Sequence, residues 1–382
     1  MRDKQFLMIP GPTPVPQTAL LEMCKAPIGH RSTEFSAILK ETYEDLKWLF
    51  QTKNNVFIFT ASGTGAMEAA LSNILNPGDK VLSLVIGNFG ERLAKISATR
   101  GAEVERMVVD FGQTIDVNAL KDRLAKDVNK EIKVITLTHS ETSTGCANPI
   151  KDLLAVIKEH GALSVVDGVT SVGAMDVKPD EWGIDILISG SQKGFMVPPG
   201  LSFLMASDRA MKAYEECKYP SFYFDFAAHK KNLEKDTTPY TPAVSLICAL
   251  NATLKMMKEE GLENIFARHK KLALGLRKAI RAMGLKLFVD DDSKASYSIT
   301  AILPPDGITV ADIRKGLKEN FDIVVADGQN DLKGKIFRMG TLGYVCERDV
   351  IGSIGALELT LKKLGANIEL GSGVKAFLES IA

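Results

Sequence analysis

Between residues 56 and 206 short apolar runs alternate with segments of helical period, and this alternation restricts the fold more than any other feature. The runs are short and mostly apolar, which is typical of strands in a parallel sheet covered by helices. We therefore expect an α/β fold, a large domain with a mostly parallel sheet flanked by helices. The runs are 56–60, 80–86, 104–109, 133–138, 162–167, 186–188 and 201–206, the last resembling a short returning strand.

Unusual residues stand where these strands end, namely the turn 62–65, Phe89, Thr142, Asp167 and Lys193. The carboxyl ends of parallel strands meet at one edge of the sheet, which is where open α/β sheets bind ligands. The five positions therefore predict one site at that edge.

Lys193 follows a buried strand and precedes Pro198, Pro199 and Gly200, which cannot continue a strand or a helix. Partial desolvation there would lower the pKa of its amine and make it a nucleophile toward carbonyls. Asp167, at the end of the preceding strand, could pair with a pyridinium nitrogen, so the two residues fit pyridoxal phosphate chemistry. The alternatives are a loop lysine and a helix-capping or turn aspartate.

The strand ending at residue 60 leads through Ser62-Gly-Thr-Gly into a helix, a geometry that places free backbone N–H groups around a phosphate. Glu68 stands where a dinucleotide fingerprint has its third glycine, so we expect a monophosphate cradle rather than a dinucleotide site. The alternative is an ordinary turn. Phe89 could stack on a planar ring or belong to the core.

The remaining chain predicts an N-terminal arm at 1–20, a large domain at 21–260 and a small C-terminal α+β domain at 261–382. The prolines in 6–16 predict an extended arm, whose apolar residues need cover. An aromatic run, 222–226, needs a covering partner. Arg338 lies on a strand among apolar neighbours and requires a carboxylate, either in a structural salt bridge or in a substrate. Further expected helices are 36–50, 150–160, 245–260, 263–283, 310–320 and 349–364, and further expected strands are 298–303, 323–326 and 336–340.

Charge and cysteine usage exclude several classes of function. The 47 basic residues balance the 47 acidic ones, which argues against a nucleic-acid or membrane-surface protein. No apolar run is long enough to span a membrane, and the N-terminus lacks the pattern of a signal peptide. The five cysteines and five histidines are dispersed, so we expect reduced thiols, a cytoplasmic location and no metal site.

Taken together, these residues resemble the class V aminotransferases of PLP fold type I, most of all the alanine–glyoxylate and serine–pyruvate (serine–glyoxylate) group. The resemblance covers essentially the whole chain. Its motifs are Pro10-Gly-Pro-Thr-Pro, His30-Arg-Ser-Thr-Glu-Phe, Ser62-Gly-Thr-Gly-Ala-Met-Glu-Ala, Thr142-Ser-Thr-Gly, Val166-Asp-Gly, Ser189-Gly-Ser-Gln-Lys-Gly, Thr238-Pro-Tyr-Thr-Pro-Ala and Phe337-Arg-Met-Gly.

The resemblance implies pyridoxal 5'-phosphate as cofactor, held by Lys193 as a Schiff base, with the same lysine later moving the substrate proton. Asp167 would pair with the ring nitrogen, Phe89 (often Trp in the family) would stack on the ring, and Thr142 would contact the 3-hydroxyl region. The resemblance also implies that the phosphate is bound by Ser62, Gly63, Thr64 and Gln192. It implies a homodimer with shared sites, in which Tyr240 and Thr241 contact the phosphate of the partner subunit. The substrate would be contacted by Arg338 and Gly11.

The implied reaction is a ping-pong transfer of an amino group from alanine or serine to glyoxylate or pyruvate. Alternatives on the same scaffold are a cysteine desulfurase using Cys346, a kynureninase-like lyase, and a phosphoserine or phosphonate transaminase using His30 and Arg31. An assembly subunit without catalytic activity is a further alternative, against which Lys193 and Asp167 argue. Some relatives carry a soluble hydrogenase label, but the chain has no clustered cysteines to hold nickel or iron.

Overall fold

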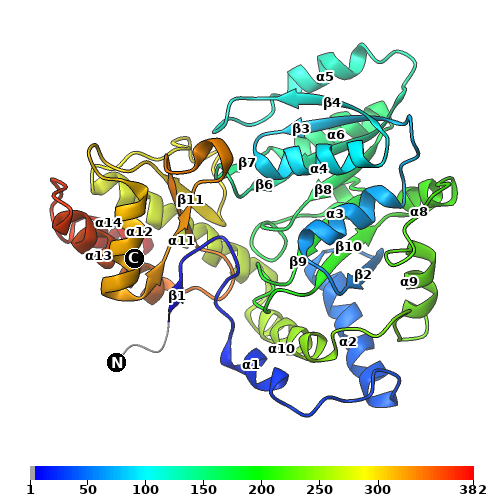
Figure 1. Cartoon of the computed structure of the whole chain (residues 1–382), viewed down its shortest axis with the longest axis horizontal. Coiled ribbons are helices and arrows are strands. Elements are labelled where there is room, and N and C mark those ends of the chain that lie inside the picture. Colours follow the sequence, from blue (N-terminus) through cyan, green and yellow to red (C-terminus); the bar gives the residue numbers. More distant parts are fainter. Residues whose placement is uncertain (1–4) are drawn as a thin grey trace.

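A computed structural model of the chain describes residues 5–382, and its centre is a seven-stranded sheet (Figure 1). The strand order is β2-β10-β9-β8-β5-β3-β4, and every neighbouring pair is parallel except the two that involve β10. The strands are β2 (Asn55–Phe59), β3 (Lys80–Val85), β4 (Glu103–Val108), β5 (Ile132–Thr138), β8 (Leu163–Asp167), β9 (Ile186–Gly190) and β10 (Ser202–Ala206). The predicted mostly parallel sheet is confirmed.

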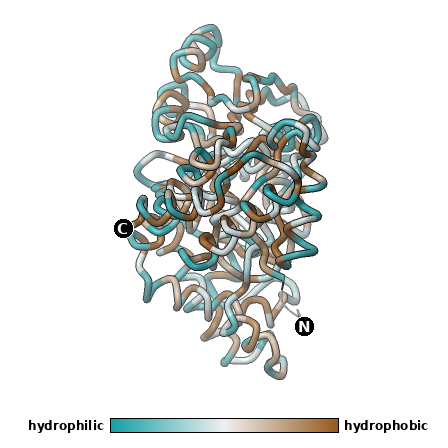
Figure 2. Tube along the Cα trace, turned by 90° about the vertical axis from the view of Figure 1, so that its left-hand side faces the viewer, coloured by the Kyte–Doolittle hydropathy of each residue, from teal (hydrophilic) through white to brown (hydrophobic). Residues whose placement is uncertain are grey.

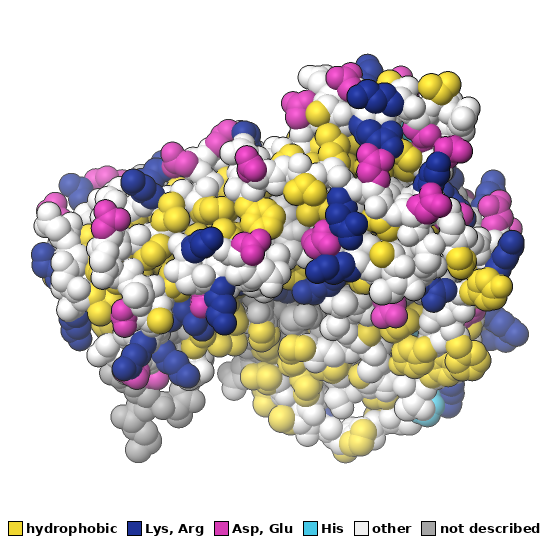
Figure 3. All heavy atoms as spheres, turned by 45° about the horizontal axis from the view of Figure 1, so that its top comes forward, with side chains coloured by type: hydrophobic (Ala, Val, Ile, Leu, Met, Phe, Trp, Pro, Cys, Tyr) yellow, Lys and Arg dark blue, Asp and Glu magenta, His cyan; other side chains and the backbone are white. Residues whose placement is uncertain are grey.

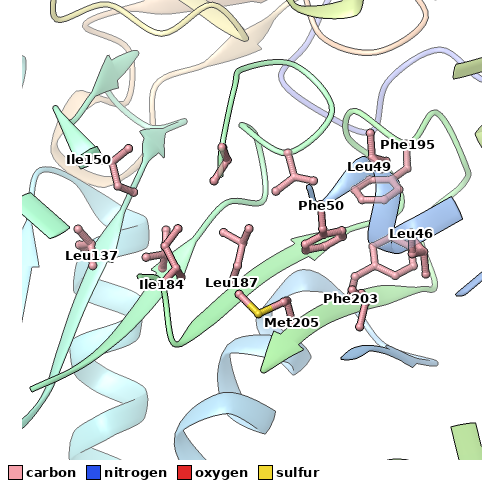
Figure 4. Close-up of a cluster of buried hydrophobic side chains, with 14 of the residues drawn as sticks. Leu46, Leu49, Phe50, Leu137, Ile150, Ile184, Leu187, Phe195, Phe203 and Met205 are labelled. Carbon is pink, nitrogen blue, oxygen red and sulfur yellow. The ribbon is translucent and has the colours of Figure 1, made fainter. Parts of the chain in front are cut away.

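Helices bury both faces of this sheet. Successive strand residues point to opposite faces, so each strand contributes side chains to two separate hydrophobic clusters. In β2, Val56 and Ile58 belong to one hydrophobic cluster while Phe57 and Phe59 belong to another. The first cluster receives side chains from α2 (Thr33–Leu49), α5 (Val117–Ala125), α6 (Ile150–His160) and α10 (Val244–Glu260), and the second from α3 (Gly63–Ser72), α4 (Asn88–Thr99) and α8 (Asp208–Glu215). Figure 4 shows Leu46 and Leu49 of α2, with Phe50, beside Phe203 of β10 in the first cluster.

The C-terminal part has its own hydrophobic cluster and a three-stranded antiparallel sheet, β11-β14-β13. The predicted single strand at 323–326 is wrong. It divides into β12 (Ile323–Val324) and β13 (Ala326–Asp327) because the two halves pair with different strands. The other elements here are α11 (Leu262–Ala282), β11 (Ile299–Ile302), α12 (Val310–Phe321), the 3₁₀ turn η1 (Asn330–Leu332), β14 (Phe337–Gly340), α13 (Glu347–Lys363) and α14 (Ser372–Ile381).

The N-terminal arm crosses to the C-terminal part of the chain (Figure 1). Its strand β1 (Phe6–Leu7) pairs in parallel with β12, and Met8 is fully buried in the C-terminal cluster. Phe6 packs against the same cluster, so two of the apolar residues of the arm are covered there. The boundaries at 20/21 and 260/261 stay a prediction.

Small elements complete the chain, namely α1 (Gln17–Met23), β6 (Ser140–Glu141), β7 (Cys146–Ala147), α7 (Pro179–Trp182) and α9 (Phe226–Leu233). Hydrophobic segments run mostly through the interior and hydrophilic turns lie at the periphery (Figure 2). Figure 3 shows basic and acidic side chains interspersed over one face, in agreement with 47 residues of each sign. Among the described helices, none combines the length and hydrophobicity needed to cross a bilayer.

Candidate active site

The carboxyl ends of β2, β3, β5, β8 and β9 meet at one edge of the sheet, because these strands all run in the same direction. Asp167 ends β8 and is paired with Ile188 of β9, the strand that leads to Lys193. The topology thus brings the two residues to neighbouring positions, as the sequence predicted.

The amine of Lys193 lies in a partly buried position beneath the N-terminal arm, where its Nζ donates a hydrogen bond to the Pro10 carbonyl at 2.6 Å. Burial lowers the pKa of Lys193 to about 8, and the nearby charge of Asp167 works in the opposite direction. The guanidinium groups of Arg338 and Arg92 add to the lowering. An amine with this pKa is partly neutral near physiological pH and can attack a carbonyl carbon.

The arm is fixed directly to the lysine segment. The Thr13 hydroxyl donates to the Lys193 carbonyl at 3.0 Å, and the Thr13 amide donates to the Gln192 carbonyl at 3.1 Å. Gly11 has φ +135°, and a Cβ at this position would lie 2.5 Å from Lys193 Nζ. A side chain there would strain the backbone and meet the lysine, so glycine suits this position next to the amine. Its expected contact with the substrate stays a prediction.

Asp167 is 3% exposed, and burial raises the pKa of its carboxyl to about 7. Its Oδ1 accepts the Val169 amide at 2.8 Å, and Oδ2 accepts no hydrogen bond from residues 5–382. The free oxygen can accept a hydrogen bond from a ring nitrogen. A cationic partner would then favour the ionised carboxylate.

Helix α3 begins at this edge with donors that have no partner. Ser62 is its N-cap but forms no side-chain capping bond, and the amides of Gly63 and Thr64 form no hydrogen bond within residues 5–382. Nearby, Gln192 Oε1 is buried without a partner. An ideal Cβ on Gly190 would lie 3.3 Å from this oxygen and 3.5 Å from the Gly63 amide nitrogen, so the two groups are close. This arrangement fits the phosphate of pyridoxal 5'-phosphate.

The first turn of α4 is closed by side chains from the segment after β5. The Ser143 hydroxyl accepts the Asn88 amide at 3.0 Å, and Glu141 Oε2 accepts the amides of Phe89 and Gly90 at 3.1 and 3.2 Å. Glu141 Oε1 accepts the Ser143 amide at 3.0 Å and its hydroxyl at 2.6 Å. Two helix N-termini thus face this edge, but only that of α3 is open to an anion.

Glu141 is completely buried, which raises the pKa of its carboxyl, while the four hydrogen bonds act in the opposite direction. Each carboxylate oxygen already accepts two hydrogen bonds, which leaves no site for a proton, so we assign the ionised form. A Cβ on Gly87 would lie 2.5 Å from Glu141 Cγ and from Ser143 Oγ. Glycine is therefore required at Gly87 for the carboxylate to approach the helix.

Phe89, Thr142 and Arg338 lie around the same edge. Phe89 is partly buried, with the Arg92 guanidinium 4.5 Å from its ring centroid. The Thr142 hydroxyl lies 3.4 Å from that of Thr170, and the Thr142 carbonyl accepts a hydrogen bond from Arg338 Nη1 at 2.8 Å.

Arg338 is 3% exposed, and its Nε and Nη2 donate to the Asp327 carbonyl at 2.8 and 2.6 Å. Burial lowers the pKa of Arg338 to about 10, against the nearby charges of Glu141 and Asp327. No carboxylate of residues 5–382 forms an ion pair with it, so the structural salt bridge considered from the sequence is not formed. One N–H on each of Nη1 and Nη2 is left for a ligand carboxylate.

Tyr240 and Thr241 are not brought to this edge within one chain. The Tyr240 hydroxyl donates to the Phe222 carbonyl at 3.0 Å, and its ring stacks on Tyr223 with centroids 5.3 Å apart. Thr241 is exposed, and neither residue forms a hydrogen bond with Lys193 or Asp167.

Two residues of the alternatives considered above have other partners. Arg31 Nη1 donates to the Thr237 hydroxyl at 2.5 Å and to the Thr238 carbonyl at 2.6 Å. Cys346 caps α13, with its Sγ 3.3 Å from Asp349 Oδ2. Arg31 thus holds the segment before Tyr240, and Cys346 stabilises a helix terminus.

Two residues of the site, Glu141 and Arg92, were not among those predicted from the sequence. Glu141 stands in the polar run after a buried strand. Arg92 follows Phe89 by about one helical turn, which puts Arg92 and Phe89 on one face of α4. These were the signals that could have identified them.

Comparison with known proteins agrees with this geometry. The family model described as Aminotransferase class-V matches residues 12–342. The chain is 47% identical over 378 residues to the "Soluble hydrogenase 42 kDa subunit" of Anabaena cylindrica, covering 98% of each. It is 39% identical to the serine–glyoxylate aminotransferase of Hyphomicrobium methylovorum, over 98% of this chain and 93% of the relative. The crystal structure of an alanine–glyoxylate aminotransferase from Nostoc sp. superposes with a TM-score of 0.90 at 31% identity, covering 94% and 96% of the two chains.

Proposed function

Because the chain belongs to the class-V aminotransferase family, we propose that it transfers the amino group of alanine or serine to glyoxylate or pyruvate. It is a PLP-dependent aminotransferase, and its cofactor is pyridoxal 5'-phosphate. The observation that carries the proposal is the meeting of three groups at one sheet edge: the amine of Lys193, the carboxyl of Asp167 and the guanidinium of Arg338.

The bound cofactor supplies an aldehyde for the amino group and a ring that accepts electrons from the substrate carbon. Lys193 would hold the aldehyde. After displacement by the substrate amine, its Nζ would accept the α-proton of the substrate and release it at the carbon that had carried the aldehyde. A pKa of about 8 suits this proton transfer near neutral pH. Asp167 Oδ2 would hold the proton of the ring nitrogen, and Phe89 and Thr142 would orient the ring.

The substrate carboxylate would bind the two free N–H groups of Arg338, and a planar two-point contact of this kind fixes its orientation. Donor and acceptor both carry this carboxylate, so one clamp would serve both halves of a ping-pong reaction. Pro10 and Gly11 lie against the lysine amine and leave little room above it. Their closeness supports small substrates such as alanine, serine and glyoxylate.

The experiment that tests this function is a visible absorbance spectrum of the cofactor-loaded protein before and after L-alanine or L-serine. We expect the yellow band to bleach and to return on addition of glyoxylate or pyruvate. Lys193→Ala should lose this cycle while it remains folded by circular dichroism. Bleaching by phosphoserine alone would instead favour the phosphoserine transaminase alternative, and normal turnover by Lys193→Ala would refute the mechanism.

The same proposal includes a homodimer in which Tyr240 and Thr241 complete the phosphate site of the other subunit. Its support is the aromatic run, in which Phe222 is 83% exposed and Tyr223 40% exposed, next to the loop that carries Tyr240. Mixing inactive Lys193→Ala chains with chains altered at both Tyr240 and Thr241 should restore part of the activity, because one of the two shared sites would be intact. No recovery after subunit exchange would contradict the shared site.

The hydrogenase name is a statement about the Anabaena relative, and we do not propose that activity here. Within residues 5–382 no three histidine, cysteine, aspartate or glutamate side chains are grouped so that they could hold a metal ion. The five cysteines are unpaired, which supports a reducing compartment such as the cytoplasm.

A further inference from the structure

The proposed phosphate cradle is built from uncharged residues. Ser62, Gly63, Thr64 and Gln192 offer amides and hydroxyls, whereas a phosphate monoester carries between one and two negative charges near neutral pH. Lys193 is committed to the aldehyde end of the cofactor. The N-terminus of α3 supplies only a partial positive charge, so a cation from another part of the chain would complete the match to the phosphate.

Arg92 is the one lysine or arginine in residues 5–382 that forms a hydrogen bond with a cradle side chain. Its Nη1 donates to the Thr64 hydroxyl at 2.9 Å, while its guanidinium lies 4.5 Å from the centroid of the Phe89 ring. The side chain thus links the phosphate end of the site to the residue that would stack on the ring.

Arg92 also keeps free binding capacity. A guanidinium has five N–H donors, and within the described chain only one hydrogen bond from Arg92 is formed and no carboxylate pairs with it. On the neighbouring strand, Arg106 is by contrast occupied by Glu91 at 3.0 Å. The charge of Arg92 also contributes to lowering the pKa of both Asp167 and Lys193, so its influence extends to the groups expected to react.

We propose that Arg92 is the cationic ligand of the cofactor phosphate and that it acts together with Thr64. The Thr64 oxygen accepts the Arg92 N–H, so the Thr64 hydroxyl proton points to a different acceptor. In the cradle that acceptor is a phosphate oxygen. The proposal rests on the cradle assigned above and adds the charge that this assignment lacks.

The test compares two aldehydes, pyridoxal 5'-phosphate and pyridoxal, which differ only in the phosphate. The dissociation constant of each is measured by absorbance titration of the cofactor-free full-length protein. In Arg92→Gln we expect affinity for pyridoxal 5'-phosphate to fall about tenfold to a hundredfold, because a charge-assisted contact is lost, while affinity for pyridoxal stays unchanged. Arg92→Lys should recover part of the loss. Lys95→Gln, which removes an exposed charge from the same helix, should match the wild type.

An unchanged ratio of the two affinities in Arg92→Gln would overturn the proposal. One form of that result is an equal loss for both aldehydes, which would mean that Arg92 acts on the ring through Phe89. Thr64→Val, measured in parallel, separates the two levels of the argument. If Thr64→Val also leaves the ratio of the two affinities unchanged, the cradle assignment fails. If Thr64→Val changes this ratio while Arg92→Gln does not, only the role of Arg92 fails.

Discussion

The buried carboxylate of Glu141 gives the most demanding prediction, because it holds two parts of the site at once. It accepts hydrogen bonds from the first turn of α4, which carries Phe89, and from Ser143, next to Thr142. Glu141→Gln preserves the shape of the side chain but replaces one acceptor oxygen by an NH₂ group. Glutamine can therefore satisfy either the α4 amides or Ser143, but not both.

The expected cost follows from counting the backbone amides that lose a partner. If the glutamine oxygen faces α4, the Ser143 amide is left without an acceptor. If it faces Ser143, the amides of Phe89 and Gly90 are left without acceptors. A buried donor without a partner costs about 1–3 kcal/mol, so the local stability falls by about 1–6 kcal/mol. The opening equilibrium of the affected turn then rises about fivefold at the lower limit.

Hydrogen exchange of backbone amides, followed by mass spectrometry, measures this opening directly. We expect faster exchange in peptides covering Phe89 and Gly90 or Ser143, together with a shifted absorbance band of the bound cofactor. The matched control is Glu91→Gln on the same helix, which removes a partly exposed carboxylate paired with Arg106 and should cost less than about 1 kcal/mol. Wild-type exchange in both segments of Glu141→Gln would refute the argument that this carboxylate holds them.

Three further predictions concern the groups at the sheet edge. Arg338→Lys should raise KM for amino acid and oxo acid together in steady-state assays, because lysine lacks the planar two-point contact; unchanged KM values would remove Arg338 from the site. The rate at which the cofactor-free protein recombines with pyridoxal phosphate should rise with pH around a midpoint near 8, and in Asp167→Asn this midpoint should move down, since the aspartate charge raises the pKa of Lys193. Burial raises the pKa of Asp167 in the folded chain to about 7, whereas that of an unfolded aspartate is near 4. Ionising this carboxyl therefore costs more in the folded chain than in the unfolded one, and the free energy of unfolding falls as pH rises between these values. The free energy of unfolding, measured with urea on the cofactor-free proteins, should therefore fall less in Asp167→Asn than in the wild type between pH 5 and pH 8. An equal fall in both proteins would contradict the assigned pKa.

The sheet was predictable because most of its strands are buried on both faces and so appear as apolar runs, whereas the edge strand β4 is largely exposed and carries Glu105 and Arg106. The predictions were less complete where burial is one-sided or the element is short. Helix α5 was not predicted, since it is short and buries only Leu120 and Leu124. The division of 323–326 depends on β1, which lies at the other end of the chain, and no local pattern indicates that pairing.

The site divides in the same way. Lys193 and Asp167 could be placed because strand ends of a parallel sheet converge by topology alone. Glu141 could not, because its burial depends on amides of α4 that are distant in sequence. Arg92 looks like any other polar residue of a surface helix until α3 and α4 are placed side by side and Thr64 becomes its partner.

The pairing of β1 with β12 has a consequence for the order in which the protein matures. Synthesis proceeds from the N-terminus and early segments begin to fold first, yet Phe6 and Leu7 find their partners only when Ile323 and Val324 have left the ribosome. The last strand of the large sheet ends at Ala206, so that sheet can form while Pro10 and Gly11 are attached on one side only, through the bonds of Thr13 to the lysine segment. The cover of the reactive amine is thus completed late in synthesis, and a chain that stops before residue 323 would keep its lysine while lacking the strand partner that holds the other end of the cover.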